Sequence, residues 1–303
     1  MNEFEQQLAR LLGSEQIKRN EPLCCHTTFQ IGGPADYFVT PKTPEDITRV
    51  IALCREHTIP FYVLGNGSNL LVGDKGYRGL ILHIGKGMDQ ISFSKEGIVH
   101  AQAGVLLSKL ANEIAAHAYT GFEFASGIPG SLGGAVAMNA GAYGSEMKDV
   151  LKEATILDED NQIRILTNKE LSFSYRNSKI QMEHLIVLEA AFSFMLDDKE
   201  VIFSRMAELN QRRKDKQPLQ LPSAGSTFKR PKGYFAGKLI EDTGLRGYRV
   251  GGASISTKHC GFVVNDNKAT AQDVLALVHQ VDEQVHEKFG VHLEPEIRMI
   301  GEF

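Results

Sequence analysis

The stretch from Ser126 to Gly144 constrains the fold of this chain more than any other. It reads Ser-Gly-Ile-Pro-Gly-Ser-Leu-Gly-Gly-Ala-Val-Ala-Met-Asn-Ala-Gly-Ala-Tyr-Gly, with six glycines among nineteen residues and no charged side chain. A flexible linker would be rich in serine and charge, whereas small uncharged residues let a backbone press against a flat or phosphorylated group. The residues alone leave two interpretations open. One is a packed, glycine-rich helix entry without a ligand, and the other is a cradle for a cofactor.

The composition indicates a folded protein without a strong electrostatic field. The chain has 303 residues, of which 42% are hydrophobic and 23% charged, and its formal net charge is -4. This length predicts roughly two domains, and the charge argues against a nucleic acid as the main partner. No apolar run reaches the ~18 residues of a membrane span, and no basic segment followed by an apolar core opens the chain. We therefore expect a cytoplasmic protein with no membrane insertion.

The cysteines and histidines predict no metal site. Cys24 and Cys25 are adjacent, Cys54 and Cys260 stand alone, and no Cys-x-x-Cys spacing occurs. The histidines are scattered without the spacing of metal ligands. We expect reduced thiols without a disulfide or metal role.

A second glycine-containing segment, Gly65-Asn-Gly-Ser-Asn-Leu-Leu-Val72, follows a predicted strand. Asparagine and glycine accept positive φ, so successive N–H groups could point inward as an anion-binding nest. Asn-Gly is also a strong signal for a β-hairpin. Taken by itself, the segment favours the hairpin.

Hydrophobic periodicity and turn residues predict an α+β or α/β arrangement. The best-marked helix has Thr43 as its N-cap, with Pro44 in the first helical position. Helices are predicted at residues 4–12, 44–54, 107–118, 197–216, 235–242 and 270–289. Strands are predicted at residues 28–39 (two strands around a Gly-Gly-Pro turn), 60–64, 79–84, 98–103, 153–157, 162–166, 185–194, 248–254, 261–265 and 291–300. A change in composition after the charged helix predicts a smaller C-terminal unit.

Three polar residues are candidates for chemistry: Ser226, Arg176 and Glu296. Ser226 follows a glycine and precedes two cations, so it could donate a proton or act as a nucleophile. The residues around it nevertheless favour a serine that only supports a turn. Arg176 could bind a carboxylate with two hydrogen bonds, or pack its stem over Tyr175. Glu296 could transfer a proton in a cleft, or it could face solvent or pair with Arg298.

If residues 291–300 form one strand, period-two alternation determines where its side chains point. Glu294, Glu296 and Arg298 would then lie opposite Leu293, Ile297 and Met299.

Four cations crowd into ten residues near the predicted helix at 235–242. They are Lys229, Arg230, Lys232 and Lys238, with two glycines among them. Such a cluster could form a pocket for a diphosphate, and it could equally be a plain basic surface.

Five motifs, in order along the chain, resemble one known family. They are Gly65-Asn-Gly-Ser-Asn-Leu-Leu-Val, Gly127-Ile-Pro-Gly-Ser-Leu-Gly-Gly-Ala-Val-Ala-Met-Asn-Ala-Gly-Ala-Tyr-Gly, Ser174-Tyr-Arg-Asn-Ser, Gly225-Ser-Thr-Phe-Lys and Leu293-Glu-Pro-Glu-Ile. The sequence closely resembles the UDP-N-acetylenolpyruvoylglucosamine reductase family, flavoenzymes of bacterial peptidoglycan precursor synthesis. The resemblance extends from about Thr27 to Glu302.

The resemblance implies an α+β fold with a vanillyl-alcohol-oxidase-type FAD-binding region of two subdomains and a C-terminal substrate domain. We expect them at residues 1–84, 85–200 and 201–303. FAD would lie between the subdomains with its pyrophosphate against the two glycine segments. The implied cofactor-binding residues are Gly65, Asn66, Gly67, Ser68, Asn69, Leu70, Gly127, Ile128, Pro129, Gly130, Ser131, Gly133, Gly134, Ala137, Asn139 and Gly141.

The resemblance also implies the reaction. NADPH would reduce the flavin and leave, and UDP-N-acetylglucosamine enolpyruvate would take its place and be reduced. Arg176 would neutralise charge that develops on the substrate carboxylate, Ser226 would donate the proton, and Glu296 would assist. Lys229, Arg230 and Lys238 are the implied substrate-binding cations.

Two departures from the family pattern stand out. Arg230 replaces an asparagine that many members carry, and the chain between Asn177 and Asp197 is too short for a long tyrosine-bearing flap. The chain therefore resembles the shorter, second type of this reductase. Two rival hypotheses remain at this point: an oxidase of the same flavoprotein superfamily, and a nucleotide-binding module without catalysis.

Overall fold

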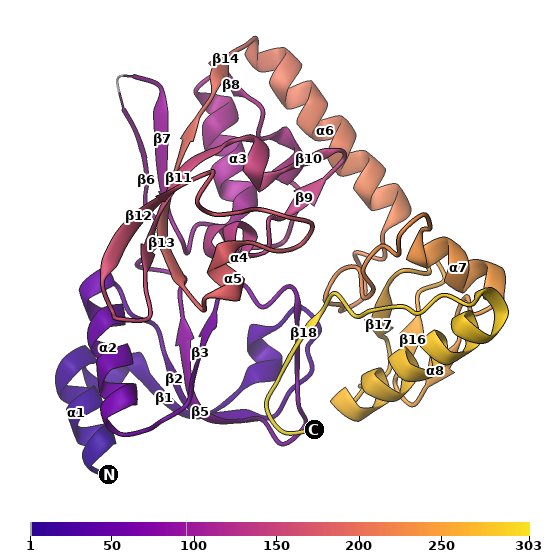
Figure 1. The fold of residues 1–303 in the computed structure, drawn as a ribbon, viewed down its shortest axis with the longest axis horizontal. Coiled ribbons are helices and arrows are strands. Elements are labelled where there is room, and N and C mark those ends of the chain that lie inside the picture. The colour runs from indigo at the N-terminus through magenta and orange to yellow at the C-terminus, as the bar shows by residue number, and fades with distance from the viewer. Residues whose placement is uncertain (1, 95) are drawn as a thin grey trace. The chain divides into compact units, whose positions relative to one another are not determined.

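The computed structural model describes residues 2–94 and 96–303, which form two compact units (Figure 1). Unit 1 comprises the residues up to Arg19, Tyr37–Asn66 and Gly79–Arg213, and unit 2 comprises Asn20–Asp36, Gly67–Arg78 and Lys214–Phe303. Each unit encloses its own hydrophobic core. The predicted division into three domains stays a prediction.

Unit 1 contains most of the regular structure. Its helices are α1 (Glu3–Leu12), α2 (Pro44–Glu56), α3 (Leu107–Ala116), α4 (Leu132–Ala137), α5 (Lys179–Met182) and α6 (Lys199–Lys216), of which the last three residues belong to unit 2. Its strands are β3 (Phe61–Leu64), β6 (Ile91–Phe93), β7 (Ile98–Gln102), β8 (Tyr119–Thr120), β9 (Gly141–Ala142), β10 (Ser145–Glu146), β11 (Leu151–Leu157), β12 (Ile163–Thr167), β13 (Ile186–Ser193) and β14 (Met195–Leu196).

The main sheet of unit 1 has five antiparallel strands in the order β12-β11-β13-β7-β6. The predicted hairpin is confirmed in it, since Glu153 pairs with Thr167 and Leu157 with Ile163. Helix α4 packs against β13 and β7 (Figure 1). The glycine-rich stretch is thereby fixed against the centre of a sheet.

A second sheet has the strand order β1-β2-β5-β3, with β1 at Ile17–Pro22, β2 at Pro34–Val39 and β5 at Tyr77–His83. Strands β3 and β5 run parallel, with Phe61 opposite Leu80. The chain reaches β3 through α2, whose start is as predicted: the Thr43 side chain accepts a hydrogen bond from Asp46 N. Residues 28–33 do not form the strand predicted there; the described strand starts at Pro34.

Unit 2 is built around two longer helices and short strands. Its elements are β4 (Leu70–Val72), α7 (Ala236–Thr243), β15 (Arg249–Val250), β16 (Ala253–Ile255), β17 (Val263–Asn265), α8 (Ala271–Phe289) and β18 (Arg298–Ile300). One face of α8 lies in the core of unit 2, where five of its hydrophobic residues are buried: Val274, Leu277, Val278, Val281 and Val285. The predicted extent of this helix is confirmed, and its caps are Thr270 at the start and Gly290 at the end, where φ is 68°.

Two predicted strands of unit 2 are wrong in extent. Residues 248–254 form a tight hairpin of β15 and β16, because Gly251 has a φ of 53° and turns the chain. Residues 291–300 contain only β18 at their end and a single bridge from Pro295 to Phe228. The predicted alternation places Leu293, Ile297 and Met299 on one face of a strand. Leu293 and Ile297 are buried as this predicts, whereas Met299 is 37% exposed and does not fit it.

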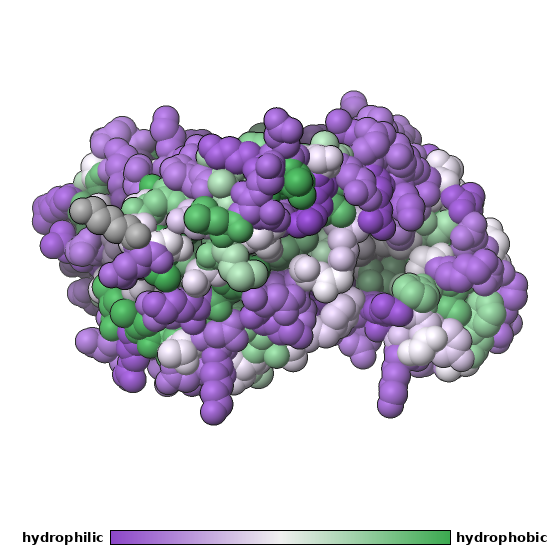
Figure 2. Space-filling view, turned by 90° about the horizontal axis from the view of Figure 1, so that it is seen from above, coloured by the Kyte–Doolittle hydropathy of each residue, from purple (hydrophilic) through white to green (hydrophobic). Residues whose placement is uncertain are grey.

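Figure 2 shows one face of the molecule, on which hydrophilic side chains predominate and hydrophobic ones form separate patches. Among the helices of the described residues, none is long and apolar enough to span a bilayer.

Candidate functional site

The two glycine segments meet within unit 1. A Cβ atom on Gly65 would clash with Ser131 Oγ, and Asn66 Nδ2 donates a hydrogen bond to Pro129 O at 2.7 Å. Segments that are some sixty residues apart in the chain are therefore in direct contact, and a side chain at Gly65 would separate them.

Some of the backbone donors of the glycine-rich stretch bond within unit 1. At the start of α4, Leu132 N donates to Val105 O and Gly133 N donates to Ala103 O, both at 2.8 Å. Within the described chain, the N–H groups of residues 66–68 donate no backbone–backbone hydrogen bond. The start of α4 is thus packed against Ala103 and Val105. Among the described residues, the N–H groups of Gly127, Gly130 and Ser131 donate no backbone–backbone hydrogen bond either, so both segments keep donors for an anion.

The Asn-Gly segment is not the hairpin that its residues favoured. Strand β3 before it pairs with β5, and strand β4 after it pairs in parallel with β18, with Leu70 opposite Arg298. Gly67 has a φ of 60°, and a Cβ there would clash with the carbonyl oxygen of His26. Only glycine fits this position without moving the backbone.

The end of the Asn-Gly segment contacts a predicted catalytic residue within unit 2. Asn69 Nδ2 donates to Glu296 O at 3.2 Å, and Arg298 N donates to Asn69 O at 2.9 Å. Glu296 itself is half-buried. These bonds join a segment predicted to bind FAD to one predicted to assist catalysis.

The Ser226 loop is paired with the same segment. Glu296 N donates to Thr227 O at 2.7 Å, and Lys229 N donates to Glu294 O at 2.8 Å. Thr227 is buried and its hydroxyl accepts from Val263 N at 2.8 Å, whereas Ser226 beside it is exposed. The structure therefore brings Ser226 and Glu296 together on neighbouring segments, with Ser226 accessible from outside the unit.

The basic cluster is divided among separate partners. Lys229 Nζ lies 3.0 Å from Glu294 Oε2, and Lys238 Nζ lies 2.6 Å from Asp242 Oδ1, a hydrogen bond that raises the pKa of Lys238. Arg230 Cζ stacks 3.9 Å from the ring centroid of Phe235. These contacts do not merge the cations into one cluster, so their role toward a diphosphate stays a prediction.

Arg176 belongs to unit 1, whereas Ser226 and Glu296 belong to unit 2. It is half-buried and has a φ of 56°, which is uncommon for a residue with a Cβ. Its Nη2 donates to Gly141 O at 3.4 Å, and its Cζ lies 5.1 Å from the centroid of the Tyr175 ring. Arg176 thus packs on Tyr175, as one interpretation expected, and it also reaches the glycine-rich stretch. Its binding of a carboxylate stays a prediction.

Asn139 and Gly141, predicted to bind the cofactor, make internal contacts. Asn139 is fully buried; its Nδ2 donates to Glu146 Oε2 at 2.8 Å and to Ser174 O at 3.0 Å. A Cβ on Gly141 would lie 2.7 Å from Glu146 Cβ, across the β9–β10 pair. These contacts explain both residue types without a ligand.

His259 lies in a segment that resembles a family signature, and we expect no catalytic role for it. Burial lowers the pKa of His259 below its ordinary value, and its Nδ1 accepts a hydrogen bond from Gly261 N at 3.1 Å. The neutral imidazole therefore has a structural role in this turn.

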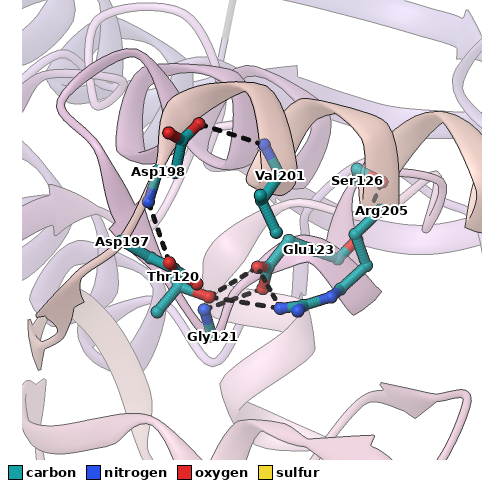
Figure 3. A network of polar contacts seen from close by, with 8 residues as sticks. All are labelled: Thr120, Gly121, Glu123, Ser126, Asp197, Asp198, Val201 and Arg205. Atoms are coloured by element: carbon teal, nitrogen blue, oxygen red, sulfur yellow. Dashed lines mark hydrogen bonds and ion pairs between the residues drawn. The ribbon is translucent and has the colours of Figure 1, made fainter.

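Glu123 is a buried carboxylate that the sequence analysis missed. It lies three residues before the glycine-rich stretch, and its side chain is 6% exposed. Thr120 Oγ1 and Gly121 N each donate to it at 2.7 Å, and Arg205 Nη1 of α6 donates at 3.0 Å (Figure 3). Ser126 Oγ donates to the Glu123 carbonyl at 2.8 Å. The one signal in the sequence that could have identified Glu123 is its position, an acidic residue just before an uncharged segment.

Helix α6 contacts both ends of the glycine-rich stretch within unit 1. A Cβ on Gly127 would lie 2.7 Å from Asn210 Oδ1 and 3.0 Å from Arg213 Cδ. At the other end, Tyr143 OH donates to Leu209 O at 3.1 Å. Together with Glu123 and Arg205, these contacts make α6 a brace for the stretch.

We predict that Arg205→Met lowers the free energy of unfolding by about 1.5–3 kcal/mol, because a buried carboxylate loses a charged hydrogen-bond donor. Urea unfolding followed by circular dichroism would measure it. Glu208→Ala is the matched control, because it removes an exposed ion pair with Arg212 on the same helix and should cost less than about 1 kcal/mol. Equal losses in the two variants would contradict the bracing role.

Two family models match the chain. The model described as FAD binding domain matches residues 35–167. The model described as UDP-N-acetylenolpyruvoylglucosamine reductase, C-terminal domain, matches residues 217–300. The first match includes both glycine segments, and the second includes Ser226 and Glu296.

Curated proteins and solved structures that are similar to this chain include reductases of the same kind. A UDP-N-acetylenolpyruvoylglucosamine reductase of Lachnoclostridium phytofermentans is 54% identical over 304 aligned residues, covering 99% of this chain and 98% of the relative. The crystal structure of such a reductase from Thermus caldophilus superposes with a TM-score of 0.79 at 37% identity, covering 93% and 97% of the two chains. p-Cresol methylhydroxylase, at 16% identity and a TM-score of 0.50, covers 97% of this chain and 65% of its own, and it shares the fold alone. The predicted α+β fold of the vanillyl-alcohol-oxidase type is confirmed.

Proposed function

We propose that this chain, which belongs to the UDP-N-acetylenolpyruvoylglucosamine reductase family, reduces UDP-N-acetylglucosamine enolpyruvate to UDP-N-acetylmuramate with NADPH as hydride donor. It is an FAD-containing oxidoreductase of peptidoglycan precursor synthesis. The observation that carries this function is similarity to such reductases over nearly the whole chain. A cytoplasmic location follows from the proposal, because NADPH and UDP-sugars are supplied there.

The residues of this chain fit FAD. The Gly65–Leu70 segment carries backbone donors without a backbone acceptor in the described chain, and no charged side chain stands in it. Gly65 and Gly67 are held where a Cβ would clash, so the backbone itself forms the surface. We propose that this segment and Gly127–Ser131 hold the pyrophosphate by backbone contact. When bound, FAD accepts a hydride from NADPH and passes it to the vinyl carbon of the substrate.

The protein must supply the proton that completes the reduction. Hydride addition to the terminal carbon of the enolpyruvyl group leaves an electron pair at the carbon next to the carboxylate, and that carbon must be protonated. We propose that Ser226 donates this proton, since this residue is exposed on a loop held by buried Thr227. Glu296, which is hydrogen-bonded through its backbone to that loop, would orient the donor or return a proton to it.

The negative charge that develops on the substrate carboxylate needs a fixed cation. We propose that Arg176 supplies it, because a guanidinium can bind both carboxylate oxygens and stays charged throughout. Such preorganised groups commonly contribute about 2.7–4 kcal/mol to transition-state stabilisation. Lys229, Arg230 and Lys238 are proposed to contact the diphosphate of the nucleotide.

The test of the function is direct. We expect the purified protein to be yellow and to release its flavin on denaturation, and its oxidation of NADPH to depend on UDP-N-acetylglucosamine enolpyruvate. A colourless protein would indicate a flavin-free binding module. A flavoprotein whose NADPH oxidation the enolpyruvyl nucleotide does not stimulate would indicate an oxidase and overturn the proposed function.

A further inference from the structure

The turn that carries Arg176 is fastened to the C-terminal end of α4 and the residues after it by three side chains, of which those of Ser178 and Gln181 have no assigned role. Ser178 Oγ and Gln181 Nε2 donate to the same carbonyl, Ala137 O, at 2.6 and 2.7 Å. Asn139 Nδ2 donates to Ser174 O at 3.0 Å. The turn is thus bonded both before and after Arg176.

Gln181 also holds Arg176 directly. The same Nε2 group donates to the Arg176 carbonyl at 3.2 Å, so one amide bridges Ala137 O and Arg176 O. An amide NH₂ group has two protons, which matches these two acceptors. Gln181 lies on α5 and is half-buried, so these bonds are partly shielded from water.

The backbone of this turn requires such support. Arg176 has a φ of 56°, and the turn is closed by the hydrogen bonds Ser174 N to Asn177 O at 3.0 Å and Asn177 N to Ser174 O at 3.2 Å. A left-handed conformation is disfavoured for a residue with a Cβ and persists where the surroundings determine it. The Gln181 bridge acts on the residue in that conformation.

We propose that Gln181 is a positioning residue for Arg176. By holding the Arg176 carbonyl against Ala137 O of the glycine-rich stretch, it fixes the backbone from which the guanidinium projects. The inference rests on the proposed role of Arg176, and it adds a residue that no motif of the family resemblance contains. Its chemistry is indirect, because Gln181 acts through the backbone of another residue.

The test uses Gln181→Met, which keeps the length of the side chain and removes both donors, and Gln181→Glu, which keeps its shape. In each we expect turnover of the enolpyruvyl nucleotide to fall between about 10- and 100-fold, as misplaced catalytic groups do. The FAD content and the rate of flavin reduction by NADPH should remain as in the wild type. Glu183→Ala, which removes the ion pair with Lys179 on the same helix, is the control and should turn over normally.

A double-mutant comparison separates positioning from general support of the fold. If Gln181 acts through Arg176, adding Gln181→Met to Arg176→Ala should cause no further loss of turnover. A further loss of the same size in that background would overturn the positioning role and leave the proposed function intact. Normal turnover of Arg176→Ala alone would overturn both the positioning role and the proposed role of Arg176, whereas normal turnover of Gln181→Met would overturn only the former.

Discussion

Ser226→Ala is expected to slow the reoxidation of reduced flavin by the enolpyruvyl nucleotide by about 10²- to 10⁴-fold, the usual contribution of a general acid. Alanine has no proton to donate to the carbon next to the substrate carboxylate. Reduction of the flavin by NADPH needs no such donor and should keep its wild-type rate. Stopped-flow measurement of the two half-reactions, with NADPH and substrate added in separate mixing steps, would show the difference.

The control for this variant lies on the same loop. The described hydrogen bonds of Ser223 are made by its backbone, since its N donates to Thr28 O at 3.1 Å and its O accepts from the Thr28 hydroxyl at 2.6 Å. Ser223→Ala should therefore leave both half-reactions unchanged. If Ser226→Ala slowed both half-reactions equally, Ser226 would have a structural role and the proton donor would have to be another group.

Gly67→Ala is expected to weaken FAD binding by at least about 100-fold, which corresponds to ~2.7 kcal/mol. The added methyl group would clash with the carbonyl oxygen of His26, which is backbone and cannot swing away. The Asn-Gly segment would have to move, and with it the backbone donors proposed for the pyrophosphate. The flavin content of the purified protein and titration of the apoprotein with FAD would measure the effect.

The matched control separates the clash from the cost of positive φ. Gly244, at the end of α7, has a φ of 90° and nothing within 4 Å of an added Cβ. Gly244→Ala should cost about 1–2 kcal/mol of stability and retain FAD. A folded Gly67→Ala protein that binds FAD as the wild type does would remove this segment from the cofactor site.

The parts of the fold that the sequence predicted well are those with strong local signals. The cap at Thr43 lies where predicted, and the helix predicted at residues 270–289 is present between caps at Thr270 and Gly290. In each case a residue interacts with backbone only a few positions away. Such contacts depend on neighbouring residues and not on distant parts of the chain.

The predictions that failed depended on partners distant in the chain. The Asn-Gly pair in Gly65–Val72 favoured a hairpin, but β4 pairs with β18, which lies more than two hundred residues later. Residues 291–300 alternate like one strand, yet only Arg298–Ile300 pair with another strand. A strand forms only where a second segment of the chain lies in register beside it. Composition contains no information about which partner will be present.

The candidate site shows the same division. Arg176, Ser226 and Glu296 could be named from motifs, because the family resemblance identifies them one by one. Glu123 and Gln181 could not, since one is a single acidic residue and the other a glutamine in a short helix. Only the tertiary structure shows the groups they contact, which are Arg205 for Glu123 and the carbonyls of Ala137 and Arg176 for Gln181.

The sequence by itself determined the six longest helices of the described chain, the cap at Thr43, the family and the two glycine segments, because these depend on residue type and short-range spacing. The tertiary structure alone decided which backbone donors of the glycine segments bond within the protein. It packs the start of α4 against Ala103 and Val105, and it leaves the amides of residues 66–68 without a backbone acceptor in the described chain. The physical reason is that a backbone N–H donates to whichever acceptor the fold brings within about 3 Å, and the fold brings those acceptors from distant parts of the chain.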